Sequence, residues 1–96
     1  MNDYLNNKKV IILGFGKEGK STYEYIRKHD KNIKLLIMDD NYQNIKLDDE
    51  NVTYSKIDYR LFNDYDIIFK SPGVSFKNVD ITPFKDKITS QLDYLL

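Results

Sequence analysis

A strand, a glycine-rich turn and a helix are predicted to follow one another in the segment VIILGFGKEGKST, residues 10–22. The four apolar residues before Gly14 are typical of a strand that is buried on both faces of a parallel sheet. Gly14, Gly16 and Gly19 match the pattern G-x-G-x-x-G, in which a tight turn exposes backbone N–H groups at the start of a helix. Such a turn binds nucleotide phosphates, so the segment predicts an α/β fold with a nucleotide site.

The rest of the chain alternates short apolar runs with polar or helical segments, which favours a parallel sheet built from βαβ units. A single domain over residues 1–96 is expected, with a Rossmann-like parallel sheet of about five strands and helices on both faces. The strands are expected at Lys9–Leu13, Ile33–Asp39, Val52–Lys56, Tyr65–Lys70 and from Ile88 onward. Helical segments are expected at Lys20–His29, Tyr59–Asp64 and, as one turn, near Pro83.

The composition excludes several classes of protein. Fifteen basic and fifteen acidic residues cancel, so no general attraction to nucleic acid or anionic membrane is expected. The absence of cysteine excludes disulfides and fits a cytoplasmic protein. No apolar run approaches the roughly 20 residues that cross a bilayer. The apolar ending DYLL has no polar cap, and we expect a further domain to follow it.

The glycine turn has a second interpretation. Residues 14–21 also spell G-x-x-x-x-G-K-S, the P-loop of ATP- and GTP-binding proteins. Two features favour the dinucleotide-type turn. Gly16 is not required by a P-loop, and Asp39 ends the very next strand, where a Rossmann-type fold places the acid that binds the ribose or the base. A small P-loop phosphotransferase remains the alternative.

Charged residues near the turn suggest how the ligand is held. Lys17 and Lys20 add positive charge near a bound diphosphate, whereas Glu18 is expected to face solvent and favour the helix N-terminus. The acidic run Asp48–Glu50 lacks the spacing of a calcium loop, so a solvated loop is expected there.

A resemblance to a known family rests on four segments, which read KKVIILGFGKEGKST, LLIMDDN, DIIFKSPGV and KITSQLDYLL. In order and spacing they resemble the N-terminal domain of the MurD-type Mur ligases, which add D-glutamate to UDP-N-acetylmuramoyl-L-alanine in peptidoglycan synthesis. SPGV after the fourth strand is the most discriminating element, because ordinary NAD-binding domains seldom carry that turn.

The resemblance implies a binding site for the UDP part of that substrate. The diphosphate would lie on the backbone of Gly16 to Gly19, and the residues after the second strand would face the uracil and ribose. Asp40 and Asn41 depart from the Thr and the Arg or Lys that the family commonly shows there. The UDP-binding residues implied are Gly14, Phe15, Gly16, Lys17, Glu18, Gly19, Asp39, Asp40, Asn41, Ser71, Pro72 and Gly73.

The resemblance also implies where the chemistry occurs. The whole protein would be an ATP-dependent, amide-forming ligase, with ATP and Mg²⁺ bound by a central domain and a C-terminal domain beyond it. This chain would carry no catalytic residue, metal or cofactor of its own. Replacement of Asp39 by alanine would weaken UDP-sugar binding and leave thermal stability nearly unchanged. The alternative is an NAD-binding regulatory domain of the potassium-transport type, which shares a GFG turn and an acid after the second strand.

Overall fold

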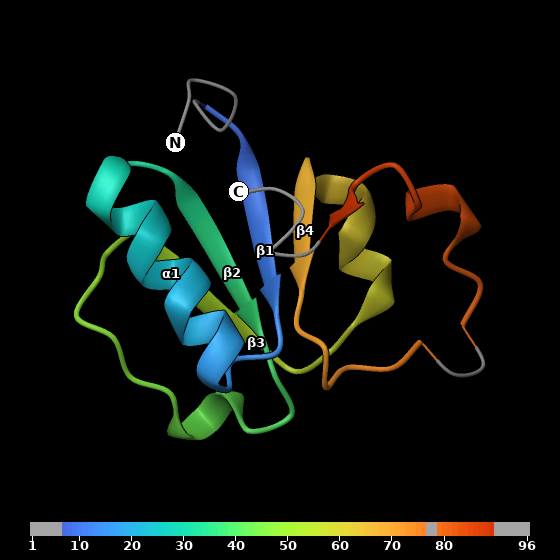
Figure 1. Ribbon diagram of the computed structural model, residues 1–96, viewed down its shortest axis with the longest axis horizontal. Helices are drawn as coiled ribbons and strands as arrows, with labels where there is room; N and C mark the ends of the chain where they lie inside the picture. The colour runs from blue at the N-terminus through green and yellow to red at the C-terminus, as the bar shows by residue number, and fades with distance from the viewer. Residues whose placement is uncertain (1–6, 77–78, 90–96) are drawn as a thin grey trace.

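The protein is a three-layered α/β domain in the computed structural model, which describes residues 7–76 and 79–89 (Figure 1). Five parallel strands form one sheet in the order β3-β2-β1-β4-β5. This confirms the predicted Rossmann-like parallel sheet. The strands are β1 (Lys9–Leu13), β2 (Lys34–Met38), β3 (Val52–Ser55), β4 (Ile67–Lys70) and β5 (Ile88–Thr89). The predicted continuation beyond Thr89 lies outside the described residues.

The two faces of the sheet are covered differently. Helix α1 (Lys17–His29) lies on one face, and it is the one α-helix of the described residues. The opposite face is covered by the six-residue 3₁₀ segment η3 (Tyr59–Asp64). Helices were predicted on both faces, and the described residues place an α-helix on one face only. Two further single 3₁₀ turns are η2 (Tyr42–Asn44) and η4 (Thr82–Phe84).

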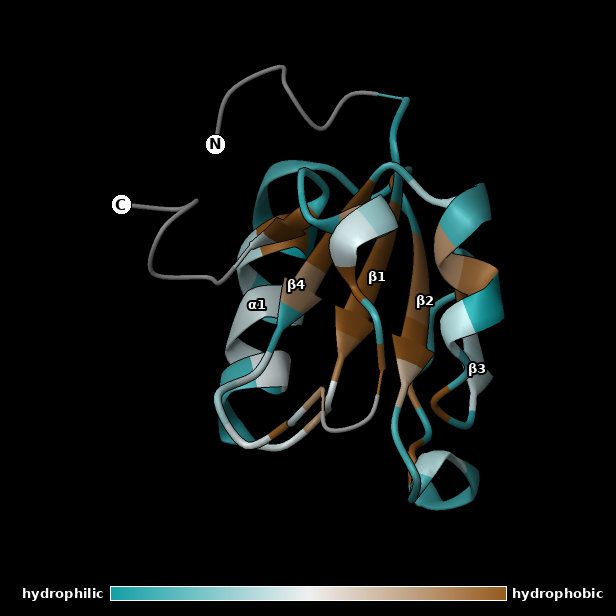
Figure 2. Cartoon of the chain, turned by 90° about the vertical axis from the view of Figure 1, so that its right-hand side faces the viewer, coloured by the Kyte–Doolittle hydropathy of each residue, from teal (hydrophilic) through white to brown (hydrophobic). Residues whose placement is uncertain are grey.

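Alternation of side chains along the strands gives the domain two cores. Val10 and Ile12 of β1 face α1, where they pack with Ile26. Ile11 and Leu13 face η3, in the same cluster as Phe62. Figure 2 shows this pattern as apolar strands at the centre, enclosed by more polar segments. Burial on both faces explains why the strands read as unbroken apolar runs.

The register of the strands brings their carboxyl ends together. Leu13, the last residue of β1, is paired with Met38 of β2 and with Lys70 of β4, each the last residue of its strand. Gly14, Asp39 and Ser71 therefore leave the sheet side by side. In a parallel sheet this edge, at the point where strand order reverses, is where ligands bind.

One expectation about the surface is wrong. Asp48 and Glu50 are exposed, but the side chain of Asp49 is only 10% exposed and pairs with Arg27 of α1, with 2.5 Å between Oδ2 and Nε. The Tyr23 hydroxyl donates a second hydrogen bond of 2.8 Å to the same carboxylate oxygen. The Arg27–Asp49 ion pair attaches α1 to the loop before β3. The run of three acids in the sequence does not indicate this pairing.

Candidate functional site

Gly14 makes the sharp turn that ends β1. Its φ is +90°, a conformation that side chains disfavour, and its N–H donates to the carbonyl of Met38 at 2.7 Å. A Cβ on Gly14 would lie 2.8 Å from Cγ2 of Val74 and 3.1 Å from Cβ of Ser71. The turn therefore needs glycine here for both conformation and space.

The carbonyl of Gly14 is held between two neighbours. The Ser71 hydroxyl donates to it at 3.0 Å, which joins the end of β4 to the turn after β1. On the other side, a Cβ added to Gly19 would lie 2.1 Å from the same carbonyl oxygen. The third glycine thus allows α1 to approach β1 closely, and the helix begins at Lys17, three residues earlier than its polar–apolar pattern predicted.

The first turn of α1 presents uncapped backbone groups to solvent. Gly16 is the N-cap residue and makes no side-chain cap, and Gly16, Lys17 and Glu18 are all exposed. The first four N–H groups of an α-helix have no acceptor within the helix. No heavy atom outside the adjoining residues lies within 4 Å of where a Cβ on Gly16 would be, so its backbone is open to a ligand.

Phe15 contributes to the site in a different way from its neighbours. Its side chain is 7% exposed and belongs to the core under α1, where its ring meets the Tyr23 ring edge-on at 6.2 Å. Its N–H donates to Oδ2 of Asp39 at 2.7 Å. The ring and the N–H of Phe15 thus both have partners inside the protein.

Asp39 holds two backbone segments together. In addition to the Phe15 amide on Oδ2, its Oδ1 accepts the N–H of Asn41 at 2.8 Å. One carboxylate therefore fixes both the glycine turn after β1 and the turn after β2. The sequence indicated an acid at this position but gave no sign that its oxygens would bind the protein's own amides.

Replacement of Asp39 by alanine is therefore expected to destabilise the domain, which revises the expectation from sequence. The buried Phe15 amide would lose its acceptor, and we expect a loss of about 2 kcal/mol in unfolding free energy. That corresponds to a fall of about 10 °C in melting temperature, measured by circular dichroism. Asp39→Asn keeps one acceptor oxygen and should lose less. A melting temperature unchanged in Asp39→Ala would contradict this structural role.

A pocket of about 410 Å³ opens at this edge of the sheet. Among the residues proposed from sequence, Gly14, Asp39, Asp40 and Gly73 line it. Ser71 fixes the turn beside it. The other predicted residues do not line it, namely Phe15, Gly16, Lys17, Glu18, Gly19, Asn41 and Pro72. The lining residues that the sequence did not indicate are Ile57, Tyr59, Val74 and Ser75. Ile57 and Tyr59 come from the start of η3 and the segment before it, and Val74 and Ser75 from the segment after β4.

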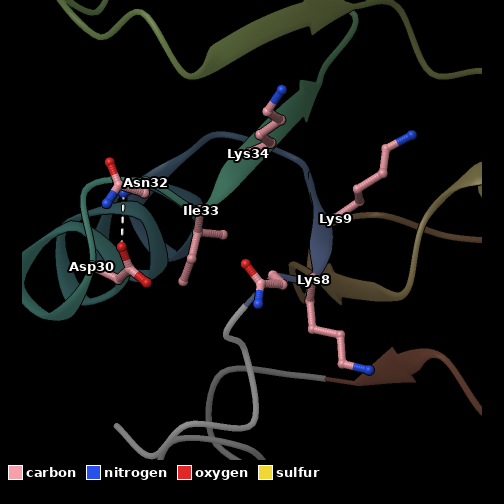
Figure 3. A pocket seen from close by; sticks show the side chains of 7 residues that line it. Lys8, Lys9, Asp30, Asn32, Ile33 and Lys34 are labelled. Carbon is pink, nitrogen blue, oxygen red and sulfur yellow. Dashed lines mark hydrogen bonds between the residues drawn. The ribbon is translucent and has the colours of Figure 1, made fainter.

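A second hollow, of about 280 Å³, lies at the opposite, amino edge of the sheet (Figure 3). Its charged lining residues are Lys8, Lys9, Lys34 and Asp30. The Asp30 carboxylate accepts the Asn32 amide at 2.8 Å. Neither the glycine turn nor the start of α1 takes part in it, and the amino edge of a parallel sheet is not where nucleotides bind.

The described residues contain neither a candidate membrane span nor a candidate metal cluster. No helix among residues 7–76 and 79–89 is both long and apolar enough for a membrane span. Within the same residues, no group of three or more His, Cys, Asp or Glu side chains is placed to hold a metal ion.

The parallel sheet, the positive-φ glycine and the uncapped helix start define a Rossmann-like α/β domain with a G-x-G-x-x-G turn between β1 and α1. The chain belongs to the MurD-like N-terminal domains of the Mur ligases, because the family model described as "Mur ligase MurD-like, N-terminal domain" matches residues 8–90. This confirms the family resemblance seen in the sequence. Comparison with curated proteins and with solved structures gave no significant match.

Proposed function

We propose that this chain binds the UDP part of UDP-N-acetylmuramoyl-L-alanine. It would serve as the N-terminal domain of an ATP-dependent ligase that adds D-glutamate in peptidoglycan synthesis. The observation that carries the proposal is the uncapped start of α1 at Gly16, two residues after Gly14, which lines a pocket of about 410 Å³, in a MurD-like domain.

The diphosphate would bind at the first turn of α1. Free N–H groups there point along the helix axis, and the helix dipole favours an anion. Gly16 has no side chain to obstruct the approach, and Lys17 and Lys20 are exposed close by. Glu18 is also exposed, so its charge is solvated beside the site, as expected for an acid in the first turn of a helix.

The nucleoside would extend from the diphosphate into the pocket. Asp39 and Asp40 supply acceptors on one side, and the SPG turn supplies Gly73 and Val74 on the other. That turn is closed by the Val74 N–H, which donates to the Ser71 carbonyl at 3.0 Å. Ser71 itself would act by holding Gly14, and hence the glycine turn, in place.

Amide formation needs an activated carboxylate and an amine, and we assign this chain neither step. ATP and Mg²⁺ would be bound by the central domain of the full-length protein, and this domain would hold the substrate by its nucleotide end. Binding energy from such a remote part of a substrate contributes to positioning its reacting end.

Titration of the 96-residue chain with UDP, NADH and ATP tests the proposal. Amide NMR shifts should change on addition of UDP at residues 14–19 and 39–41, and Gly16→Ala should weaken UDP binding about tenfold because its methyl group stands where the phosphate approaches. Binding of NADH without UDP would instead support a nucleotide-sensing domain. Magnesium-dependent ATP binding that Lys20→Ala abolishes would support a P-loop.

A further inference from the structure

The ammonium group of Lys87 is bound by three main-chain carbonyls. Its Nζ donates to the carbonyl of Tyr65 at 2.7 Å, to that of Phe62 at 3.1 Å and to that of Asn63 at 3.4 Å. An ammonium has three donors and no acceptor, so these three oxygens, called here the carbonyl site, satisfy it completely. Among residues 7–76 and 79–89, no carboxylate forms an ion pair with it. The half-buried Lys87 is thus held by backbone alone.

The carbonyl site is the end of η3. Phe62 and Asn63 lie in its last turn, and Tyr65 is its C-cap residue. The last carbonyls of a helix have no partner within the helix, and the negative end of its dipole favours a cation. A lysine that caps a helix usually stands on that helix, but Lys87 comes from a segment 22 to 25 residues further along the chain. Its ammonium therefore joins two remote segments.

The segment that Lys87 joins to η3 is the start of β5, whose pairing with the sheet is short. Only Ile88 and Thr89 of the described residues pair with β4, opposite Ile68 and Phe69. The carbonyl of Lys87 extends this pairing by accepting the Ile68 N–H at 2.9 Å. β5 lies beside β4 at the end of the strand order, with η3 close by (Figure 1). A pairing this short is expected to open separately from the rest of a domain.

Apolar contacts also hold this segment, but they do not fix its position along β4. The Phe84 ring meets the Phe62 ring edge-on at 5.4 Å, and Phe84 and Ile88 pack against the core on the η3 face. Hydrophobic attraction has no direction, whereas hydrogen bonds from a charged group are directional and roughly twice as strong as neutral ones. The ammonium of Lys87 is therefore the contact that can set where β5 begins.

We propose that the end of η3 is a cation site that Lys87 fills, and that this ammonium holds β5 in the sheet. The inference goes beyond the proposed nucleotide binding, because the carbonyl site lies at the amino ends of β4 and β5, whereas the glycine turn follows the carboxyl end of β1. β5 is the last strand of the described residues, so the same contact fixes the point from which the chain continues. Neutralising the amine releases β5 while the other four strands stay paired.

Hydrogen exchange on Lys87→Met tests this separation, because methionine keeps the length of the side chain and removes its charge. The Ile68 amide reports the attachment of β5, since it donates to the carbonyl of Lys87. The Gly14 amide, which donates to Met38, reports the pairing at the other side of β1. In the variant the Ile68 amide should exchange at least about tenfold faster, with a much smaller change at Gly14. Equal acceleration of both amides would show a global loss of stability and overturn the inference.

Lys85→Met is the matched control. It makes the same change in net charge two residues earlier, at an exposed lysine whose ammonium has no partner within the part of the chain that the structure describes. Exchange of the Ile68 amide in this variant should equal that of the wild type. If Lys85→Met accelerated it as much as Lys87→Met, net charge would explain the effect and the carbonyl site would not.

A measurement on the wild type needs no variant to fold. An amine-acetylating ester should modify Lys87 at least about tenfold more slowly than Lys85 in the native 96-residue chain, because the carbonyl site holds the Lys87 amine protonated and covered. In concentrated urea the two lysines should react alike, as peptide mass spectrometry can show. Equal rates in the native protein would mean that the site is not occupied. None of these measurements uses a nucleotide, so a failure to bind UDP leaves this inference standing.

Discussion

Gly19→Ala is expected to destabilise the domain by at least about 3 kcal/mol in unfolding free energy. The added Cβ would lie 2.1 Å from the carbonyl oxygen of Gly14 and 3.0 Å from its carbon, and both are backbone atoms that cannot rotate away. The start of α1 would have to move off β1, which separates Phe15 and Ile26 from the core they share. A fall of about 15 °C or more in melting temperature should follow.

Gly73→Ala is the matched control for this substitution. It adds the same methyl group in the same region, but no heavy atom outside the adjoining residues lies within 4 Å of its Cβ position, and its φ is not in the positive range. Its urea midpoint should equal or slightly exceed that of the wild type, since alanine restricts the unfolded chain more than glycine does. Equal stability of Gly19→Ala and Gly73→Ala would show that α1 does not approach the turn as closely as described.

Arg27→Met is expected to cost about 3 kcal/mol at neutral pH. The Arg27 side chain is 11% exposed and its Asp49 partner 10%, so the substitution leaves a nearly buried carboxylate without its cation. The guanidinium also donates to the carbonyls of Asp30, at 3.2 Å, and Asn51, at 3.4 Å, and these bonds would be lost as well. Urea denaturation of the variant and the wild type measures the difference.

The pH dependence of that difference has a definite sign. Burial alone raises the pKa of Asp49, but hydrogen bonds from Arg27, Tyr23 and the Asn51 amide outweigh it and bring the pKa below its ordinary value of 3.8. A lowered folded-state pKa stabilises the protein above pH 3.8, and this stabilisation is lost as the pH falls through the lower folded-state value. In Arg27→Met the hydrogen bond from Arg27 no longer opposes the effect of burial, so the pKa of Asp49 is higher than in the wild type. The difference in unfolding free energy between the variant and the wild type should therefore become smaller as the pH falls.

Arg60→Met provides the control for this pair. Arg60 also pairs with an aspartate, Asp58, at 2.9 Å, but its side chain is 87% exposed. Solvent screens such a pair, so this variant should unfold close to the wild type at neutral pH. If Arg27→Met were as stable as Arg60→Met, or if its deficit stayed constant as the pH fell, the buried pair would not hold α1 to the loop before β3.

Several strands and helical segments were predicted correctly from local patterns in the sequence. The expected bounds of the first strand and of η3 agree with the structure, and the others are within a few residues. The start of α1 was misplaced because the polar–apolar pattern begins only after Gly19, whereas the backbone becomes helical at Lys17. The face opposite α1 was expected to carry helices. The short segment YRLFND forms 3₁₀ turns there and no α-helix.

Part of the candidate site was predictable because some of its residues leave a local pattern in the sequence. Gly14, Gly16 and Gly19 are recognisable because backbone conformation and close approach restrict a position to glycine, and this leaves a pattern in the sequence. Tyr59 and Ile57 leave none, because aromatic and apolar residues are common in cores throughout the chain. Their presence in the pocket depends on how the segment after β3 crosses the sheet edge.

The sequence alone determined the parallel α/β architecture, the position of the glycine turn and the MurD-like family, because apolar periodicity and glycine spacing are local properties of the chain. Tertiary structure decided how the functional groups are used. Hydrogen bonding across 24 residues commits Asp39 to the Phe15 amide, while the adjacent Asp40 faces the pocket. That distinction depends on distances between segments remote in the chain, which only the packing of the sheet establishes.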